Sequence, residues 1–303
     1  MSDVVYLSRY NRHHLFHVPL FSGGRAAFLA PKTSQRDPGF DSHFSHAMTS
    51  SPRLPPELCD HIIDQLHDQP NALRSCSVVS KSWTPRSRKH IFSTISFNND
   101  SHVAAWWNAF PDPSNSPAYH ARTLAVNYRR GFPENHLSSF CNVTHLCLHV
   151  HQVDGQHTSL VQLHGFTPFL ETLRMTFPVL PSSDVLSLVY SFPLLDNLML
   201  AGRPTPSDTQ VIPLTPPKFS GTLCLGVFWG VNIDIMVNHL SSLPNGIHFR
   251  GLILLWNYSR DLPSVTNLIF ACSQTLESLD ISNKTIRTHS CPPLWSCGGS
   301  LYQ

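Results

Sequence analysis

The chain has 303 residues, of which 41% are apolar, so it can bury a core large enough for one or two domains. Only 13% of the residues are charged, and 21 Lys and Arg nearly balance 19 Asp and Glu without a long basic block. This balance argues against nucleic acid as a partner, because binding to phosphates requires a strongly basic surface. The apolar runs, such as residues 252–256, are too short to span a bilayer, so we also expect no membrane partner.

Residues 1–50 lack the apolar stretch of a signal peptide and contain Pro, Gly, Ser and His without a period. We predict that this segment is disordered and that the protein is cytoplasmic and/or nuclear; a transit peptide is the alternative, because the segment is mildly basic. Residues 283–303, rich in Pro, Gly and Ser, are expected to be a second disordered segment. Most of the eight cysteines are then expected to be reduced thiols that act as small core residues.

Residues 51–97 form the first predicted folded unit, a module of three short helices. Pro55 fits the first turn of a helix, and Leu58, Ile62 and Leu66 then recur every four residues. Three helices this short present more apolar surface than they can bury among themselves. The spacing therefore favours a module that docks on a partner or, alternatively, one that caps the following domain.

The same module carries a sequence motif. Its residues are Leu54-Pro55-x-Glu57-Leu58, Ile62, Leu66, Leu73, Cys76, Val79, Ser80-Lys81-x-Trp83 and Ile91-Phe92. This pattern resembles an F-box, and the resemblance implies binding to a Skp-type adaptor and, through it, to a cullin-type (SCF) ubiquitin ligase. On the matching positions, the residues that would face the adaptor are Leu54, Pro55, Leu58, Ile62, Leu73, Val79 and Trp83. Two further positions, Leu66 and Cys76, are expected to be internal.

Residues 98–282 are periodic. Pairs of apolar residues two apart begin at positions 124, 146, 173, 198, 223, 252 and 279, so that successive pairs are 22 to 29 residues apart. Several pairs extend to L-x-x-L-x-L, and both this pattern and the period resemble leucine-rich repeats. We therefore predict an α/β or α+β solenoid of about seven strand–helix units. The alternative is an irregular α/β domain.

The predicted strands divide their side chains between two faces, because alternate residues of a strand point in opposite directions. We expect the apolar pairs to face the core and the residues beside them to line a concave surface. The residues expected to bind a target protein there are His145, Cys147, His149, Arg174, Met199, Cys224 and Ile253. A nearly uncharged, largely apolar stripe of this kind is typical of a protein-binding surface.

One cluster of residues has the side-chain types that bind zinc. It consists of Cys141, His145, Cys147, His149 and His151. On a strand, however, same-face positions form a row rather than the tetrahedral cage that zinc requires, and the usual C-x₂₋₄-C spacing is absent. We therefore predict neither a metal nor a cofactor.

Catalytic motifs are also missing from the sequence, which contains no G-x-S-x-G, G-x-x-x-x-G-K-[ST] or H-E-x-x-H. We expect a protein without catalytic residues that brings an unidentified target protein to a ligase. The alternatives are a non-ligase scaffold, in which the helical module only caps the solenoid, and a metal enzyme built on the His/Cys cluster.

Overall fold

A computed structural model describes residues 54–128, 134–151, 160–164, 166–206, 217, 219–227, 234–241, 243, 246–255 and 262–282. The expected disordered segments, residues 1–50 and 283–303, lie outside this range. None of the described helices is long and apolar enough to cross a membrane.

Three helices form the N-terminal part, which we call the helical module (residues 54–92). They are α1 (Pro56–Gln65), α2 (Pro70–Val79) and α3 (Thr84–Ile91). Each carries a proline in its first turn, where the missing N–H has no helical acceptor to satisfy. The hydroxyl of Thr84 donates to the carbonyls of Ser77 and Ser80, at 2.8 and 3.2 Å, and so fixes the turn between α2 and α3.

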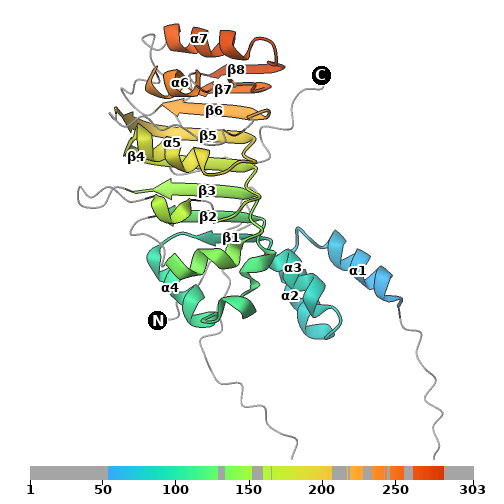
Figure 1. The fold of residues 1–303 in the computed structure, drawn as a ribbon. Coiled ribbons are helices and arrows are strands. Elements are labelled where there is room, and N and C mark those ends of the chain that lie inside the picture. The colour runs from blue at the N-terminus through green and yellow to red at the C-terminus, as the bar shows by residue number, and fades with distance from the viewer. Residues whose placement is uncertain are drawn as a thin grey trace, which may run out of the picture.

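An eight-stranded, all-parallel sheet follows the helical module, and its strands lie in sequence order (Figure 1). The strands are β1 (Thr94–Phe97), β2 (Thr123–Tyr128), β3 (His145–Val150), β4 (Thr172–Pro181), β5 (Asn197–Thr205), β6 (Thr222–Val227), β7 (Gly251–Leu255) and β8 (Ser278–Ser282). All seven predicted apolar pairs lie on strands, β2 to β8. The architecture is of the α/β type, and its strand order is compatible with a solenoid.

Helices connect the strands. They are α4 (Asp100–Ala109), η1 (Pro113–Asn115), η2 (Pro117–His120), η3 (Glu134–Phe140), η4 (Val161–Leu163), α5 (Ser182–Tyr190), α6 (Asp234–Ser241) and α7 (Leu262–Cys272), where η marks a 3₁₀ helix. The connections after β2 and β3 contain only short 3₁₀ turns among the described residues. The prediction of one strand and one helix in each unit is therefore only partly confirmed.

The predicted alternation of side chains along the strands is confirmed. Both members of the first six apolar pairs, from Leu124 and Val126 on β2 to Leu252 and Leu254 on β7, are buried in one core. The strand register places each pair beside the next, as Leu146 and Leu173 show. A continuous apolar core therefore runs beneath the sheet, as it does when parallel strands are covered by helices.

A repeated backbone motif marks the start of the strands. The amides of Glu171 and Thr172 both donate to the carbonyl of Thr144, at 2.9 and 3.0 Å. The amides of Asp196 and Asn197 donate in the same way to the carbonyl of Glu171, both at 2.9 Å. Because the motif also recurs at β2, β3, β7 and β8, it sets the same register in unit after unit.

The β1 end of the sheet differs from the prediction. Strand β1 pairs with β2, with Ile95 beside Leu124, so the sheet begins at Thr94 and not after residue 97. Aromatic side chains close this end, where Trp106 of α4 contacts Phe97 edge to face at a ring-centroid distance of 5.7 Å. Strand β1 lies at the end of the predicted module of residues 51–97, and its Ile95 and Phe97 are buried in the same core as the residues of β2.

The β8 end is more open. Leu279 and Ile281 occupy the same register as the buried Leu252 and Leu254, yet they are 46% and 47% exposed. Strand β8 is the last of the eight strands, so no further described strand packs beyond it.

Candidate functional site

Helix α1 carries two apolar faces. Cys59 and Ile63 point inward and are buried, whereas Leu54, Leu58 and Ile62 are 57%, 50% and 45% exposed. Leu58 and Ile62 lie one turn apart on one side of α1, and Leu54 lies two residues before the helix begins. The third residue of the predicted stripe, Leu66, packs instead against the core of the helical module. We call Leu54, Leu58 and Ile62 the outer row; it is an unusual amount of exposed apolar surface for so short a segment.

The core of the helical module is small. Ile63, Leu73 and Cys76 are its buried residues, and Leu66, Trp83 and Ile91 pack against them. Both residues expected to be internal, Leu66 and Cys76, belong to this core. A core of this size buries little apolar surface, so it contributes only modestly to the stability of the module.

Leu73 corrects one expectation. We expected it to face an adaptor, but it is only 1% exposed and lies inside the core of the helical module. Trp83 is also partly buried against this core. Helical spacing alone did not distinguish the inward from the outward side of α2.

The end of α2 adds further apolar surface. Val78 and Val79 are 84% and 68% exposed, and Pro55 is exposed at the start of α1. Val79 was expected to be exposed. The exposure of Val78 was not predicted, because this valine lies outside the four-residue apolar stripe. The available indication was the pair of successive valines at the end of a helix.

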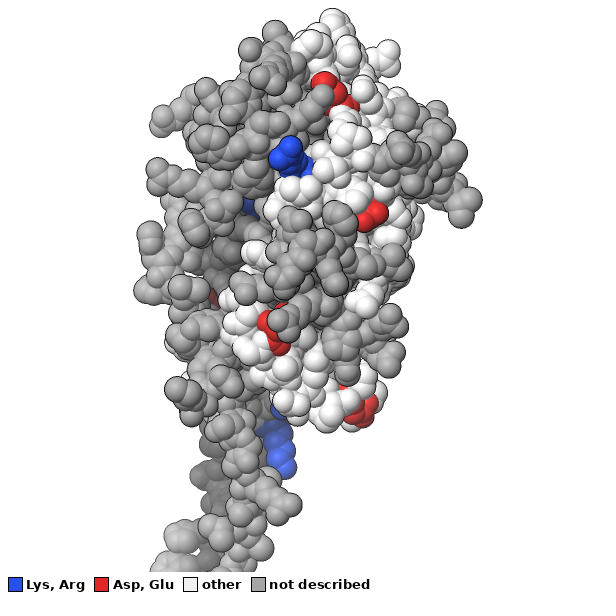
Figure 2. Space-filling model, turned by 90° about the vertical axis from the view of Figure 1, so that its left-hand side faces the viewer, with Lys and Arg blue, Asp and Glu red and all other residues white. Residues whose placement is uncertain are grey.

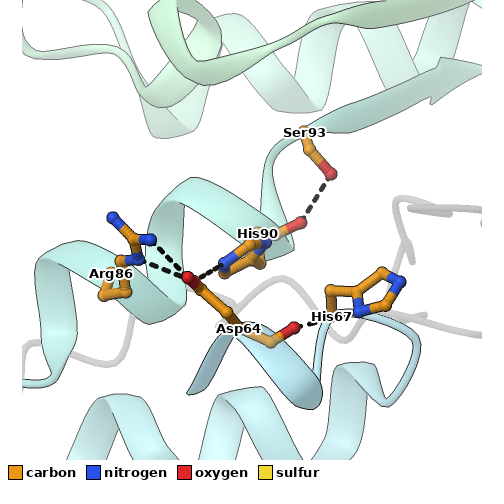
Figure 3. A network of polar contacts seen from close by, with 5 residues as sticks. All are labelled: Asp64, His67, Arg86, His90 and Ser93. Carbon is orange, nitrogen blue, oxygen red and sulfur yellow. Dashed lines mark hydrogen bonds and ion pairs between the residues drawn. The ribbon is translucent and has the colours of Figure 1, made fainter. Parts of the chain in front are cut away.

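A polar network joins α1 to α3 (Figure 3). Asp64 of α1 accepts from Arg86 Nε at 2.7 Å, forms a second contact with Arg86 Nη2, and lies 2.7 Å from His90 Nε2. The hydrogen bonds from Arg86 and His90 hold the pKa of Asp64 far below its usual range, and the Asp64 carboxylate raises the pKa of Arg86. The network fixes the angle between the two helices while it leaves the outer row free.

The second candidate site is the face of the sheet opposite the core. In successive strands, Cys147, Arg174, Met199, Cys224 and Ile253 lie side by side in register. All five are partly exposed. We call them the central column; it spans about 19 Å at roughly 4.8 Å per strand. The predicted target-binding residues are thus brought together on one face.

Two histidines flank the central column on β3. His145 Nδ1 lies 2.8 Å from the hydroxyl of Thr144, and His149 Nδ1 lies 2.6 Å from that of Thr176. Burial lowers the pKa of both imidazoles, and nearby Arg174 lowers that of His149 further. Both rings are therefore neutral at pH 7, and they offer hydrogen-bonding groups rather than charge.

The described part of the chain contains no cluster of side chains suited to bind a metal ion. No group of three or more His, Cys, Asp or Glu side chains there could hold a metal ion. Among the described residues of the His/Cys cluster, His145 and His149 make the hydroxyl contacts given above, and Cys141 is exposed.

Charged side chains are sparse on the side of the molecule that Figure 2 shows. Lys, Arg, Asp and Glu appear there as isolated spots among uncharged described residues. This agrees with the low charged fraction of 13%.

Comparison with known proteins gives no relative: neither a protein-family model nor a curated protein sequence matches this chain significantly.

Proposed function

We propose that this protein is a substrate-recognition adaptor of a cullin-type (SCF) ubiquitin ligase. The helical module, an F-box in this proposal, docks on a Skp-type adaptor. The sheet, interpreted as a degenerate leucine-rich-repeat solenoid, holds the target protein. The chain itself catalyses no reaction; it raises the effective concentration of the target near the ligase.

The outer row is the observation that carries the proposal. Leu58 and Ile62 remain half exposed although the module is otherwise folded around Ile63 and Leu73. An apolar face that the described part of the chain leaves uncovered favours a protein partner. Two exposed anchors at positions i and i+4 of one helix, Leu58 and Ile62, fit the groove of another protein, and Leu54 extends the apolar row just before the helix.

The central column supports the second half of the proposal. It combines Met199 and Ile253, which adapt to apolar side chains, with one guanidinium at Arg174. Flexible methionine and planar arginine are enriched at protein interfaces. The neutral imidazoles of His145 and His149 add hydrogen-bonding groups beside the column.

Co-purification with a Skp-type adaptor tests the docking step. We expect the wild-type chain to capture the adaptor and Leu58→Asp to lose it, because the carboxylate would be desolvated against an apolar partner. Leu194→Asp is the matched control, since Leu194 is a comparably exposed leucine (55%) that follows α5. Equal capture by all three proteins would contradict the proposal.

A second function, a scaffold without a ligase, is favoured by one observation. Phe92, just after α3, packs against the core of the sheet and lies edge to face with Trp106 at a ring-centroid distance of 6.1 Å. The helical module therefore contributes to the end of the sheet and could serve as its cap alone. A fragment of residues 93–303, which retains β1, distinguishes the two: the scaffold predicts that it unfolds, and the adaptor proposal predicts that it folds and no longer captures the adaptor.

A further inference from the structure

A compact basic surface lies where α3 meets the start of β2. Arg88 and Lys89 are exposed in the last turn of α3, and Arg122 is exposed immediately before β2. Two hydrogen bonds of Ser93 hold these segments together: its backbone carbonyl accepts from the Arg122 amide at 2.8 Å, and its hydroxyl donates to the His90 carbonyl at 2.7 Å. The basic side chains therefore project from a braced part of the fold.

Helix η2 adds an aromatic platform to this surface. Tyr119 is 57% exposed, and its ring lies against that of His120 at a centroid distance of 4.3 Å. The side-chain amide of Asn142 donates to the Tyr119 carbonyl at 2.9 Å, while the Asn142 carbonyl accepts from Arg122 Nη1 at 3.2 Å. Asn142 thus fixes both the aromatic and the cationic part of the surface.

The positive charge of this surface is not balanced within the described part of the chain. None of the ion pairs there includes Arg88, Lys89 or Arg122. Burial lowers the pKa of His120, and the charges of Lys89 and Arg88 lower it further. The same two cations therefore act together at the His120 ring, and their field is available to an acidic ligand.

We propose that Arg88, Lys89, Tyr119, His120 and Arg122 bind an acidic, carboxylate-rich peptide segment of a partner protein. Guanidinium groups bind carboxylates through paired hydrogen bonds, and an exposed tyrosine supplies apolar contact area with little loss of conformational entropy. Nucleic acid is a poorer fit, because the formal net charge of the chain is only +2 and its sequence has no long basic block. This basic surface is distinct from both the outer row and the central column, and its proposed ligand is independent of the docking of an adaptor.

Fluorescence anisotropy of the full chain tests the proposal, with a labelled peptide of alternating Glu and Ser as the probe and the Gln–Ser peptide of equal length as the neutral control. We expect the Glu–Ser peptide alone to bind, in a salt-sensitive way. The double variant Arg88→Glu/Lys89→Glu should bind it roughly tenfold more weakly, because two attractive contacts become repulsive. Tyr119→Ala should also weaken binding, and because it leaves the net charge unchanged, it tests the aromatic contact separately.

The matched control is Arg203→Glu/Arg250→Glu, which changes the net charge equally at two exposed arginines elsewhere on the sheet. It should bind like the wild type. Arg88→Gln/Lys89→Gln, a milder pair, serves if the charge reversal impairs folding, as judged by circular dichroism. The proposal is overturned if the Glu–Ser peptide does not bind, if both double reversals weaken binding equally, or if only a single-stranded oligothymidylate binds.

Discussion

Asp64 on α1 and Arg86 on α3 form a two-point ion pair, in which Arg86 Nε donates to Asp64 Oδ1 at 2.7 Å. The pair braces two helices whose shared apolar core is small. The brace and the core lie between the helices, and the exposed outer row of α1 belongs to neither of them, which is what the proposed docking requires.

Replacement of Asp64 by Asn should lower the free energy of unfolding at pH 7 by about 1 kcal/mol, a modest value because both side chains are about one-third exposed. The pKa of Asp64 is lower in the folded state than its ordinary value of 3.8. Its stabilising contribution is therefore complete above that value and is lost as the pH falls below it. Chemical denaturation at a series of pH values should show the two proteins converging in acid; a pH-independent difference would contradict this role.

Neighbouring isoleucines on α1 should behave oppositely. Ile63→Ala should cost about 2–4 kcal/mol of stability, because Ile63 is fully buried. Ile62→Ala should change stability little and weaken adaptor capture instead, since Ile62 belongs to the outer row. Denaturation and capture measured on both variants check the assignment, which fails if Ile62→Ala is as destabilising as Ile63→Ala.

Gly202 on β5 should tolerate no side chain. A Cβ at this position would lie 2.3 Å from the carbonyl oxygen of Phe177 on β4 and 2.5 Å from its ring. Gly202→Ala should therefore destabilise the sheet by about 2–3 kcal/mol, because the strands must move apart. Gly221→Ala is the milder comparison, since its nearest atoms are side-chain oxygens of Asn197 and Asp196, which can move. Thermal unfolding would refute this if the first variant were no worse than the second.

His149 should remain neutral down to pH values below the ordinary histidine value of 6.5, since burial and Arg174 both lower its pKa. An unfolded chain would bind the proton first, so this histidine reduces stability as the pH falls below 6.5. A titration of the imidazole followed by NMR measures the pKa directly. Arg174→Gln should raise it, and an unchanged value would show that Arg174 does not act on His149.

Leu252 and Leu279 are neighbours in the register of β7 and β8, but they should contribute differently to the free energy of unfolding. Leu252 on β7 is 1% exposed, whereas its neighbour Leu279 on β8 is 46% exposed. Leu252→Ala should cost about 2–4 kcal/mol and Leu279→Ala less than about 1 kcal/mol. Equal costs in denaturant titrations would mean that Leu279 is covered in solution.

The sequence predicted those features of the fold that depend on short-range periodicity. The apolar pairs of β2 to β8 lie on strands because a spacing of two, repeated at nearly constant intervals, has few other structural solutions. Strand β1 was missed because Ile95 and Phe97 directly follow a helix and lack the leucines of the other units. Leu73 was assigned to the wrong side of α2, since only the packing of three helices decides which side points inward.

Of the candidate sites, the outer row and the central column were accessible from the sequence, but the basic surface at the start of β2 was not. Arg88 and Arg122 are far apart in the chain, and Arg122 stands alone in its segment. They share one surface because the Ser93 carbonyl joins the end of α3 to the start of β2. Contacts between residues that are distant in the chain produce no local sequence pattern from which the surface could be predicted.

Hydrogen–deuterium exchange of the full chain, with and without a purified Skp-type adaptor, tests the central claim most directly. If the outer row docks on the adaptor, the amides of α1 (Pro56–Gln65) become protected when the adaptor is added, while those of β2 to β7 exchange as before. Unchanged exchange throughout α1 at saturating adaptor would contradict the account.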